Sequence, residues 1–93
     1  MSQLVDYTSL LYQRDGYVVA YCPELNVGSF GDDAEEARAS LREAVECFVE
    51  GCRELGTLEE VLEEAGYTAA PAPQARWRHP PLLRAEAMEA LVA

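Results

Sequence analysis

The sequence predicts an α+β protein: a small, mostly antiparallel β-sheet of three to four strands in the order β-β-β-α-α-β, with a long helix packed on one face. Residues 3–12 and 17–22 are rich in strand-forming residues. They flank Asp15-Gly16, two residues that tolerate the positive φ of a hairpin turn. From Ala34 to Leu55, apolar residues recur at the spacing of one helix face.

The second strand carries apolar side chains on both faces. Successive side chains of a strand point to opposite faces, so Tyr17 and Tyr21 share one face and Cys22 lies on the other. One face can therefore cover a helix, while the other contacts a second subunit. Pro23 has no amide hydrogen to donate to a neighbouring strand and ends this one. Residues 27–30 are expected to form the third strand.

The long helix has clear start and stop signals. One residue of the pair Asp32-Asp33 caps it, and a glutamate three residues later completes a capping box. Gly56 ends the helix, and a shorter helix is expected between Thr57 and Gly66. The apolar stripe of the long helix consists of Ala37, Leu41, Ala44, Val45, Phe48, Val49, Cys52 and Leu55. Its opposite side, interpreted as a solvent-facing surface, carries Glu35, Arg38, Arg42, Glu46, Glu50 and Arg53.

Three segments are expected along the chain. Residues 1–67 form the α+β core. Residues 68–81 form a linker rich in proline and alanine, because prolines discourage helix and favour an extended chain. The tail at residues 82–93 consists of good helix formers, yet its length and its place after two prolines equally suit an edge strand.

The composition limits the possible partners. The chain has 93 residues, 49% of them hydrophobic, which makes one domain close to the size at which a single core is marginally sufficient. Association into a homo-oligomer, a dimer or a tetramer, would add to that core. The formal net charge is −10, from 17 acidic and 7 basic residues, so the chain repels nucleic-acid phosphates and attracts cationic partners.

The compartment follows from the cysteines and the apolar runs. Three cysteines without paired spacing do not make a disulfide framework, and the N-terminus lacks the pattern of a secretory signal. A cytoplasmic location is therefore expected. No apolar run approaches the ~18 to 20 residues that span a bilayer, so a membrane protein is excluded at this stage.

One stretch of the chain resembles the family of HicB-like antitoxins. It is the run DGYVVAYCPELNVGSFGDDAEEARASLREAVECFVE. Their pattern is a tyrosine-containing strand after Asp-Gly, a Cys/Pro-Glu-Leu-Pro-Gly corner, a short strand, Gly-Asp, and a helix with two Glu-Ala pairs. The chain departs from it at Asn26-Val27, which replace Pro-Gly, with Gly28 one place late. The residues that fit are Asp15, Gly16, Tyr17, Val19, Ala20, Cys22, Pro23, Glu24, Leu25, Gly31, Asp32, Glu36, Ala37, Leu41, Glu43 and Ala44.

The resemblance implies both a fold and a function. It implies a truncated RNase H-like fold in which the tail returns as a fourth strand, so residues 83–92 are expected at a sheet edge. HicB-like proteins typically bind and neutralise a small basic RNA-cleaving toxin of the HicA type, often with an added domain that represses their own operon. Nothing after Leu55 is typical of a helix-turn-helix or ribbon-helix-helix motif, so no direct DNA binding is expected from this chain.

No catalytic, metal-binding or cofactor-binding residues are predicted, and the chain is not expected to be an enzyme. An RNase H-type nuclease needs several carboxylates around Mg²⁺, but only Asp6, with Glu46 or Glu50, is placed for such a set. A zinc site is disfavoured because two of the cysteines, five residues apart on a helix, point ~140° away from each other. His79 is the only histidine, and no sequence neighbour would orient it as a base.

The segment RWRHPP, residues 76–81, is the one local basic and aromatic cluster. Trp77 either stacks on a base or, as is commoner, packs on the body of the protein. The predicted function is that of a HicB-like antitoxin that binds a basic toxin; the alternative is an orphan oligomeric scaffold or small-ligand-binding module. The candidate partner-binding residues are Tyr17, Tyr21, Glu24, Leu25, Glu46, Glu50 and Trp77.

Overall fold

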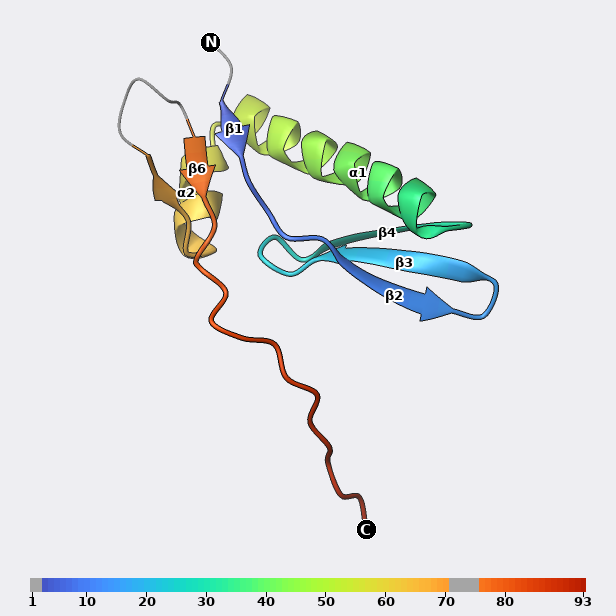
Figure 1. Ribbon diagram of the computed structural model, residues 1–93. Helices are drawn as coiled ribbons and strands as arrows, with labels where there is room; N and C mark the ends of the chain where they lie inside the picture. Colours follow the sequence, from blue (N-terminus) through green and yellow to red (C-terminus); the bar gives the residue numbers. More distant parts are fainter. Residues whose placement is uncertain (1–2, 71–75) are drawn as a thin grey trace.

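A computed structural model describes residues 3–70 and 76–93 of the chain. Three strands form an antiparallel sheet in the order β2-β3-β4, and one long helix, α1, covers one face of it (Figure 1). The predicted α+β class, the hairpin and the covering helix are confirmed. The bounds are β2 Leu10–Arg14, β3 Tyr17–Cys22, β4 Val27–Gly31 and α1 Ala34–Leu55.

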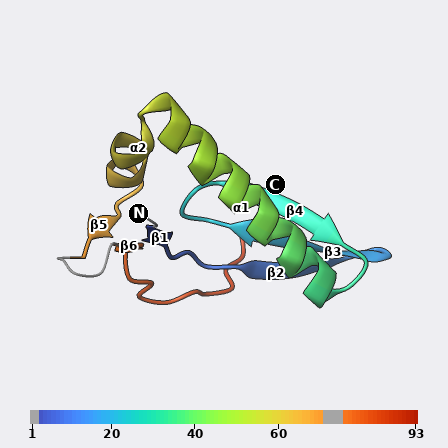
Figure 2. The same cartoon turned by 90° about the horizontal axis from the view of Figure 1, so that it is seen from above.

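A second, mixed sheet has the strand order β1-β6-β5. After the short helix α2 (Leu58–Glu64), strand β5 (Thr68–Ala69) pairs antiparallel with β6 (Arg76–Arg78). Strand β6 then pairs parallel with β1 (Leu4–Val5), with Val5 opposite Trp77. Figure 2 shows this small sheet beside the larger one. The sequence analysis did not predict this parallel pairing, which joins segments that are far apart in the chain.

The single strand expected over residues 3–12 divides into β1 and β2. Between them, among the described residues, only the Asp6 amide still bonds to a neighbouring strand, at the carbonyl of Trp77 on β6, and two other backbone groups bond to side chains. The amide of Thr8 donates to the carboxylate of Glu24, and the backbone carbonyl of Asp6 accepts from the hydroxyl of Tyr67. These contacts replace sheet hydrogen bonds because each buried backbone group needs one partner.

Both ends of α1 lie where the sequence predicts them. Asp33 caps the helix, since its side chain accepts the amide of Glu36 at 2.8 Å. The Glu36 carboxylate in turn accepts the amide of Asp32 at 3.3 Å, which completes the predicted capping box. Gly56 ends the helix in the left-handed region, with φ of 75°.

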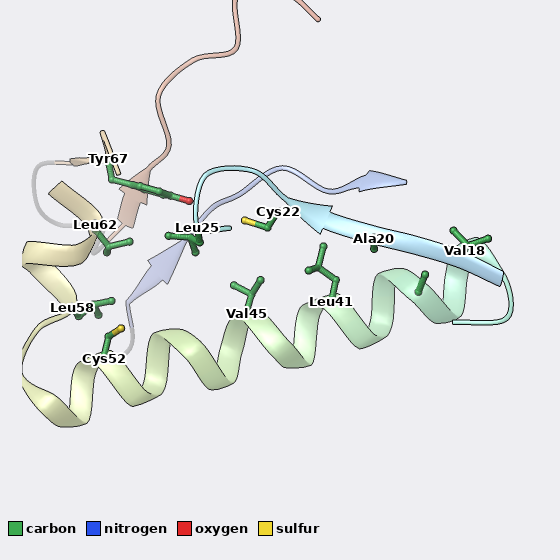
Figure 3. Close-up of a cluster of buried hydrophobic side chains, with 11 residues drawn as sticks. Val18, Ala20, Cys22, Leu25, Leu41, Val45, Cys52, Leu58, Leu62 and Tyr67 are labelled. Atoms are coloured by element: carbon green, nitrogen blue, oxygen red, sulfur yellow. The ribbon is translucent and has the colours of Figure 1, made fainter. Parts of the chain in front are cut away.

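The core lies between α1 and the sheet and continues under α2 (Figure 3). Ala20 of β3 faces Ala37 and Leu41 of α1, and all three are fully buried. The helix approaches closely because the facing residues are small. A Cβ atom added to Gly31 would lie 2.5 Å from the backbone nitrogen of Ala37. The buried hydrophobic residues are Val18, Ala20, Cys22, Leu25, Ala37, Leu41, Val45, Cys52, Leu58, Leu62 and Tyr67.

The linker and tail differ from their predicted states. The described part of the expected linker, residues 68–81, contains β5 and β6; positions 71–75 lie outside the described residues. Residues 79–93 form no helix or strand and run away from the rest of the chain (Figure 1). The edge strand expected at 82–93 is thus not formed within one chain. Pro80 and Pro81 lack amide hydrogens, so they interrupt the sheet after β6.

In the described residues, neither helix has the length and apolar character that crossing a membrane requires.

Two glycine substitutions test the close contact between β4 and α1. Gly31→Ala places a methyl group against backbone atoms of Glu36 and Ala37, so we expect a loss of about 1–3 kcal/mol in the free energy of unfolding. Gly51→Ala is the matched control, because a Cβ there meets nothing within 4 Å in a helix interior; it should raise stability by about 0.5–1 kcal/mol. Urea unfolding measures both. Equal effects of the two variants would contradict the packing.

Candidate functional site

The Pro-Glu-Leu corner after β3 is pinned on both sides. Leu25 is buried in the core, and Asn26 takes a left-handed conformation, with φ of 56°. The side chain of Glu24 reaches the segment between β1 and β2. There its carboxylate accepts the Thr8 amide at 3.0 Å and the Thr8 hydroxyl at 2.6 Å. The corner is therefore held to residues that precede β2.

The environment sets the protonation of two groups at the corner. Burial raises the pKa of Glu24, but the hydrogen bonds from Thr8 outweigh it, so the pKa lies below its ordinary value. Burial raises the pKa of the Cys22 thiol to about 11. Because the thiolate is the nucleophilic form, Cys22 is not an activated nucleophile at neutral pH.

His79 completes this cluster from the far end of the sequence. Its backbone amide donates to Asp6 Oδ1 at 2.7 Å, and its Nδ1 lies 3.6 Å from Glu24 Oε2. Its Nε2 lies 3.9 Å from Asp6 Oδ1, and its ring meets the ring of Tyr67 edge to face. We call Asp6, Thr8, Glu24, Tyr67 and His79 the corner cluster.

Sequence reasoning gave His79 no orienting partner, but in the structure its Nδ1 lies 2.8 Å from the carbonyl oxygen of Pro80, with two carboxylates near the ring. His79 and Asp6 are 73 positions apart, and Thr8 and Glu24 are 16 apart. No local pattern joins residues at such separations. The parallel pairing of β1 with β6, which was not predicted, brings His79 to Asp6, whereas the β2-β3 hairpin, with Leu10 opposite Tyr21, brings Thr8 near Glu24.

The corner cluster acts as a clamp. Its polar groups bond to one another and join the corner, the first strand segment and the chain that follows β6. Within residues 3–70 and 76–93, no group of three or more His, Cys, Asp or Glu side chains is placed to hold a metal ion. Asp6, the carboxylate considered for a nuclease, lies in this cluster, whereas Glu46 and Glu50 line a separate groove.

This groove runs between residues 3–7 and α1. Its volume is about 890 Å³, and it is open to solvent along its length. Leu4, Val5, Tyr7, Val45 and Val49 form an apolar floor. The charged residues at the groove are Arg42, Glu43, Glu46, Glu50 and Glu54. We call this feature the acidic groove.

The face of the sheet that α1 does not cover is also apolar. In the register, Tyr12 lies opposite Val19, and Val19 lies opposite Phe30, so all three share this outer sheet face. Tyr17 packs edge to face on Phe30 with ring centroids 6.0 Å apart. Tyr12, Tyr17 and Phe30 are exposed.

The structure distributes the seven candidate partner-binding residues over several places. Trp77 packs on the body, with its indole nitrogen donating to Gln3 at 3.1 Å, and Glu50 pairs with Arg53. By place, the seven are Tyr17 and Tyr21 on the outer sheet face, Glu24 and Leu25 at the corner, Glu46 and Glu50 in the acidic groove, and Trp77 on β6.

Comparisons of the chain with models of known families, with curated proteins and with solved structures find no match.

The corner cluster makes stability depend on pH. Because the folded state lowers the pKa of Glu24 below 4.5, Glu24 stabilises the fold above about pH 4.5, and this contribution is lost as the pH falls through the lowered value. Glu24→Gln should flatten this acid-side loss when urea unfolding is followed from pH 7 to pH 3. An unchanged slope would contradict the clamp.

Removing the donor tests the same contact at neutral pH. Thr8→Val deletes the hydroxyl that the Glu24 carboxylate accepts, so the free energy of unfolding should fall by about 1.5–3 kcal/mol. Thr68→Val, at an exposed threonine of β5, is the control and should change stability by less than about 0.5 kcal/mol. Comparable losses in both variants would count against the clamp.

Proposed function

We propose that this chain is a HicB-like antitoxin-type protein of the cytoplasm that binds and neutralises a small basic RNA-cleaving toxin through protein–protein contacts. The acidic groove is the observation that carries the proposal. The HicB-like run from Asp15 onward supports it from the sequence. The parallel strand that β6 adds beside β1 is consistent with a truncated RNase H-like sheet, which the proposal includes.

The charge of the groove favours a basic partner. Glu43, Glu46, Glu50 and Glu54 follow one another along one side of α1, with Arg42 as the only basic residue among those that line the groove. These acids add to a chain of net charge −10. A cleft lined by one sign of charge raises the association rate of an oppositely charged partner by about 10- to 1,000-fold.

The apolar floor gives the complex its contact area. Because helices rise ~1.5 Å per residue, the span from Glu43 to Glu54 extends over about 16 Å, or three turns. A basic amphipathic segment of the partner fits these dimensions. Its apolar side would cover Val45 and Val49, and its arginine or lysine side chains would reach the glutamates.

Such neutralisation needs no chemistry from this chain. A bound partner is inactive when its own functional surface is covered, so neither a cofactor nor a metal enters the proposal. In the corner, burial raises the pKa of the Cys22 thiol, and the Glu24 carboxylate is held by hydrogen bonds from Thr8. The acidic surface also disfavours direct DNA binding.

Charge reversal in the groove tests the proposal. A small basic protein of the HicA type, offered in excess, should bind the parent, and calorimetry should show binding at least tenfold weaker, or ~1.4 kcal/mol, for Glu46→Arg with Glu50→Arg. The control pair, Glu60→Arg with Glu64→Arg, has the same spacing and charge change on α2, outside the groove. The affinity should also fall with added salt.

Two results would overturn the proposal. If the basic protein in excess does not bind the parent chain, the antitoxin function fails, and the oligomeric scaffold becomes the better account. If the groove pair and the control pair weaken binding equally, the net charge alone attracts the partner and the groove is not its site.

A further inference from the structure

The tail of the chain is extended and apolar, although nothing in the single chain covers it. Every residue from Pro80 to Ala93 is exposed. Arg84 and Glu86 form an ion pair at 3.4 Å, which fits an extended chain because residues two apart share a face in a strand but not in a helix. The large apolar residues of the tail, with their exposed fractions, are Leu82 67%, Leu83 94%, Met88 86%, Leu91 100% and Val92 86%.

Both the accessible surface area and the radius of gyration of the chain exceed those of a compact monomer. The chain exposes 7337 Å², whereas a compact monomer of 10.3 kDa exposes about 5,400 Å². Its radius of gyration is 15.4 Å, against about 12 Å for a compact chain of this length. The excess of about 1,900 Å² in one chain is larger than the about 800 Å² that each partner buries in a standard interface.

The point where the tail leaves the body is fixed. His79 is held by the corner cluster, and Pro80 packs on Gly66, where an added Cβ would lie 3.3 Å from Pro80 Cγ. Pro80 and Pro81 cannot donate backbone hydrogen bonds, so the chain cannot extend the ladder of β6 along its own first strand. The two prolines therefore direct the tail away from its own sheet (Figure 1).

The acceptor for such a tail is the outer edge of β2. Among the described residues β2 pairs only with β3, so its other edge presents unpaired backbone groups. The usual protection of an edge is weak here, since LLYQR contains one charge and no proline. Leu11 and Tyr12, 41% and 52% exposed, lie on opposite faces of this strand. An added strand would thus find apolar neighbours on both faces.

The pattern of the tail matches this edge. In an extended chain Leu83 and Leu91 lie on one face, and Leu82, Met88 and Val92 lie on the other. Both faces therefore offer apolar side chains to β2, with the Arg84–Glu86 pair between Leu82 and Met88 on one of them. The edge of β4 is a poorer acceptor, because two of its five residues are glycine and offer little side chain to cover.

We infer that two copies of this chain exchange their tails: residues 82–92 of each copy add as a strand to the free edge of β2 of the other. The exchange is reciprocal, so a two-fold axis closes the assembly as a dimer and covers the β2 edge of both copies. It provides the edge strand that the sequence predicts but one chain does not form. It uses neither the acidic groove nor the basic partner.

The first test is the oligomeric state of the full chain. Sedimentation equilibrium of the parent should give a dimer at micromolar concentration. Leu91→Glu should raise the dimer dissociation constant at least tenfold, because it places a charge between two apolar surfaces. Leu55→Glu is the matched control, since Leu55 is 79% exposed at the end of α1 and lies outside the exchange. A monomeric parent, or a dimer that responds equally to both variants, would overturn the inference.

The second test separates a strand from a helix. One copy carries Tyr12→Cys, the other carries a single cysteine at successive positions 83–92, and both carry Cys47→Ala to remove the exposed native thiol. After mixing and oxidation with diamide, disulfide-linked dimers should form between the two different copies, with yields that alternate every second tail position. A period of 3.6 positions, or no linkage, would overturn the inference even if the chain is dimeric.

Discussion

Helix α1 can approach the sheet closely at its first turns only because the residues in contact there are small. Ala20 on β3 and Ala37 on α1 are fully buried, and Gly31 leaves no room for a side chain. This close approach places the larger side chains of α1 under Cys22 and Leu25 (Figure 3), so the corner is packed from below. With Leu25 in the core, Glu24 is directed to the first strand segment, and the corner cluster forms there.

The same contact leaves the acids of α1 on the outside. The apolar stripe of the helix is covered by the sheet and by α2, except at Leu55, which was expected in the stripe but is exposed at the end of the helix. The glutamates therefore face solvent or the acidic groove. The groove exists because residues 3–7 approach the side of α1 without filling the space beside it. Self-association through the tail and binding of a basic partner would therefore use different surfaces, which allows both in one assembly.

Local signals were sufficient for the β2-β3 hairpin, β4 and the two helices, but not for β1, β5 and β6 or for the contacts that join the elements. Asp33 and Gly56 mark the ends of α1, and Gly16, with φ of 80°, makes the hairpin turn. The corner cluster was not predictable as a whole: Thr8 and Glu24 lie just beyond the β2-β3 hairpin, but Asp6, Tyr67 and His79 join them only through the tertiary fold. The tail combines helix-forming residues with an extended conformation, so propensity alone misleads there, and the two prolines before it are the better signal.

Amide hydrogen exchange of the full chain tests the central claim, that α1 is one continuous helix held on β3. The account predicts that the amides of Leu41, Val45 and Cys52 exchange together with that of Ala20, and only through global unfolding. Exchange of the C-terminal part of α1 well before its N-terminal part, or of the whole helix before β3, would contradict it.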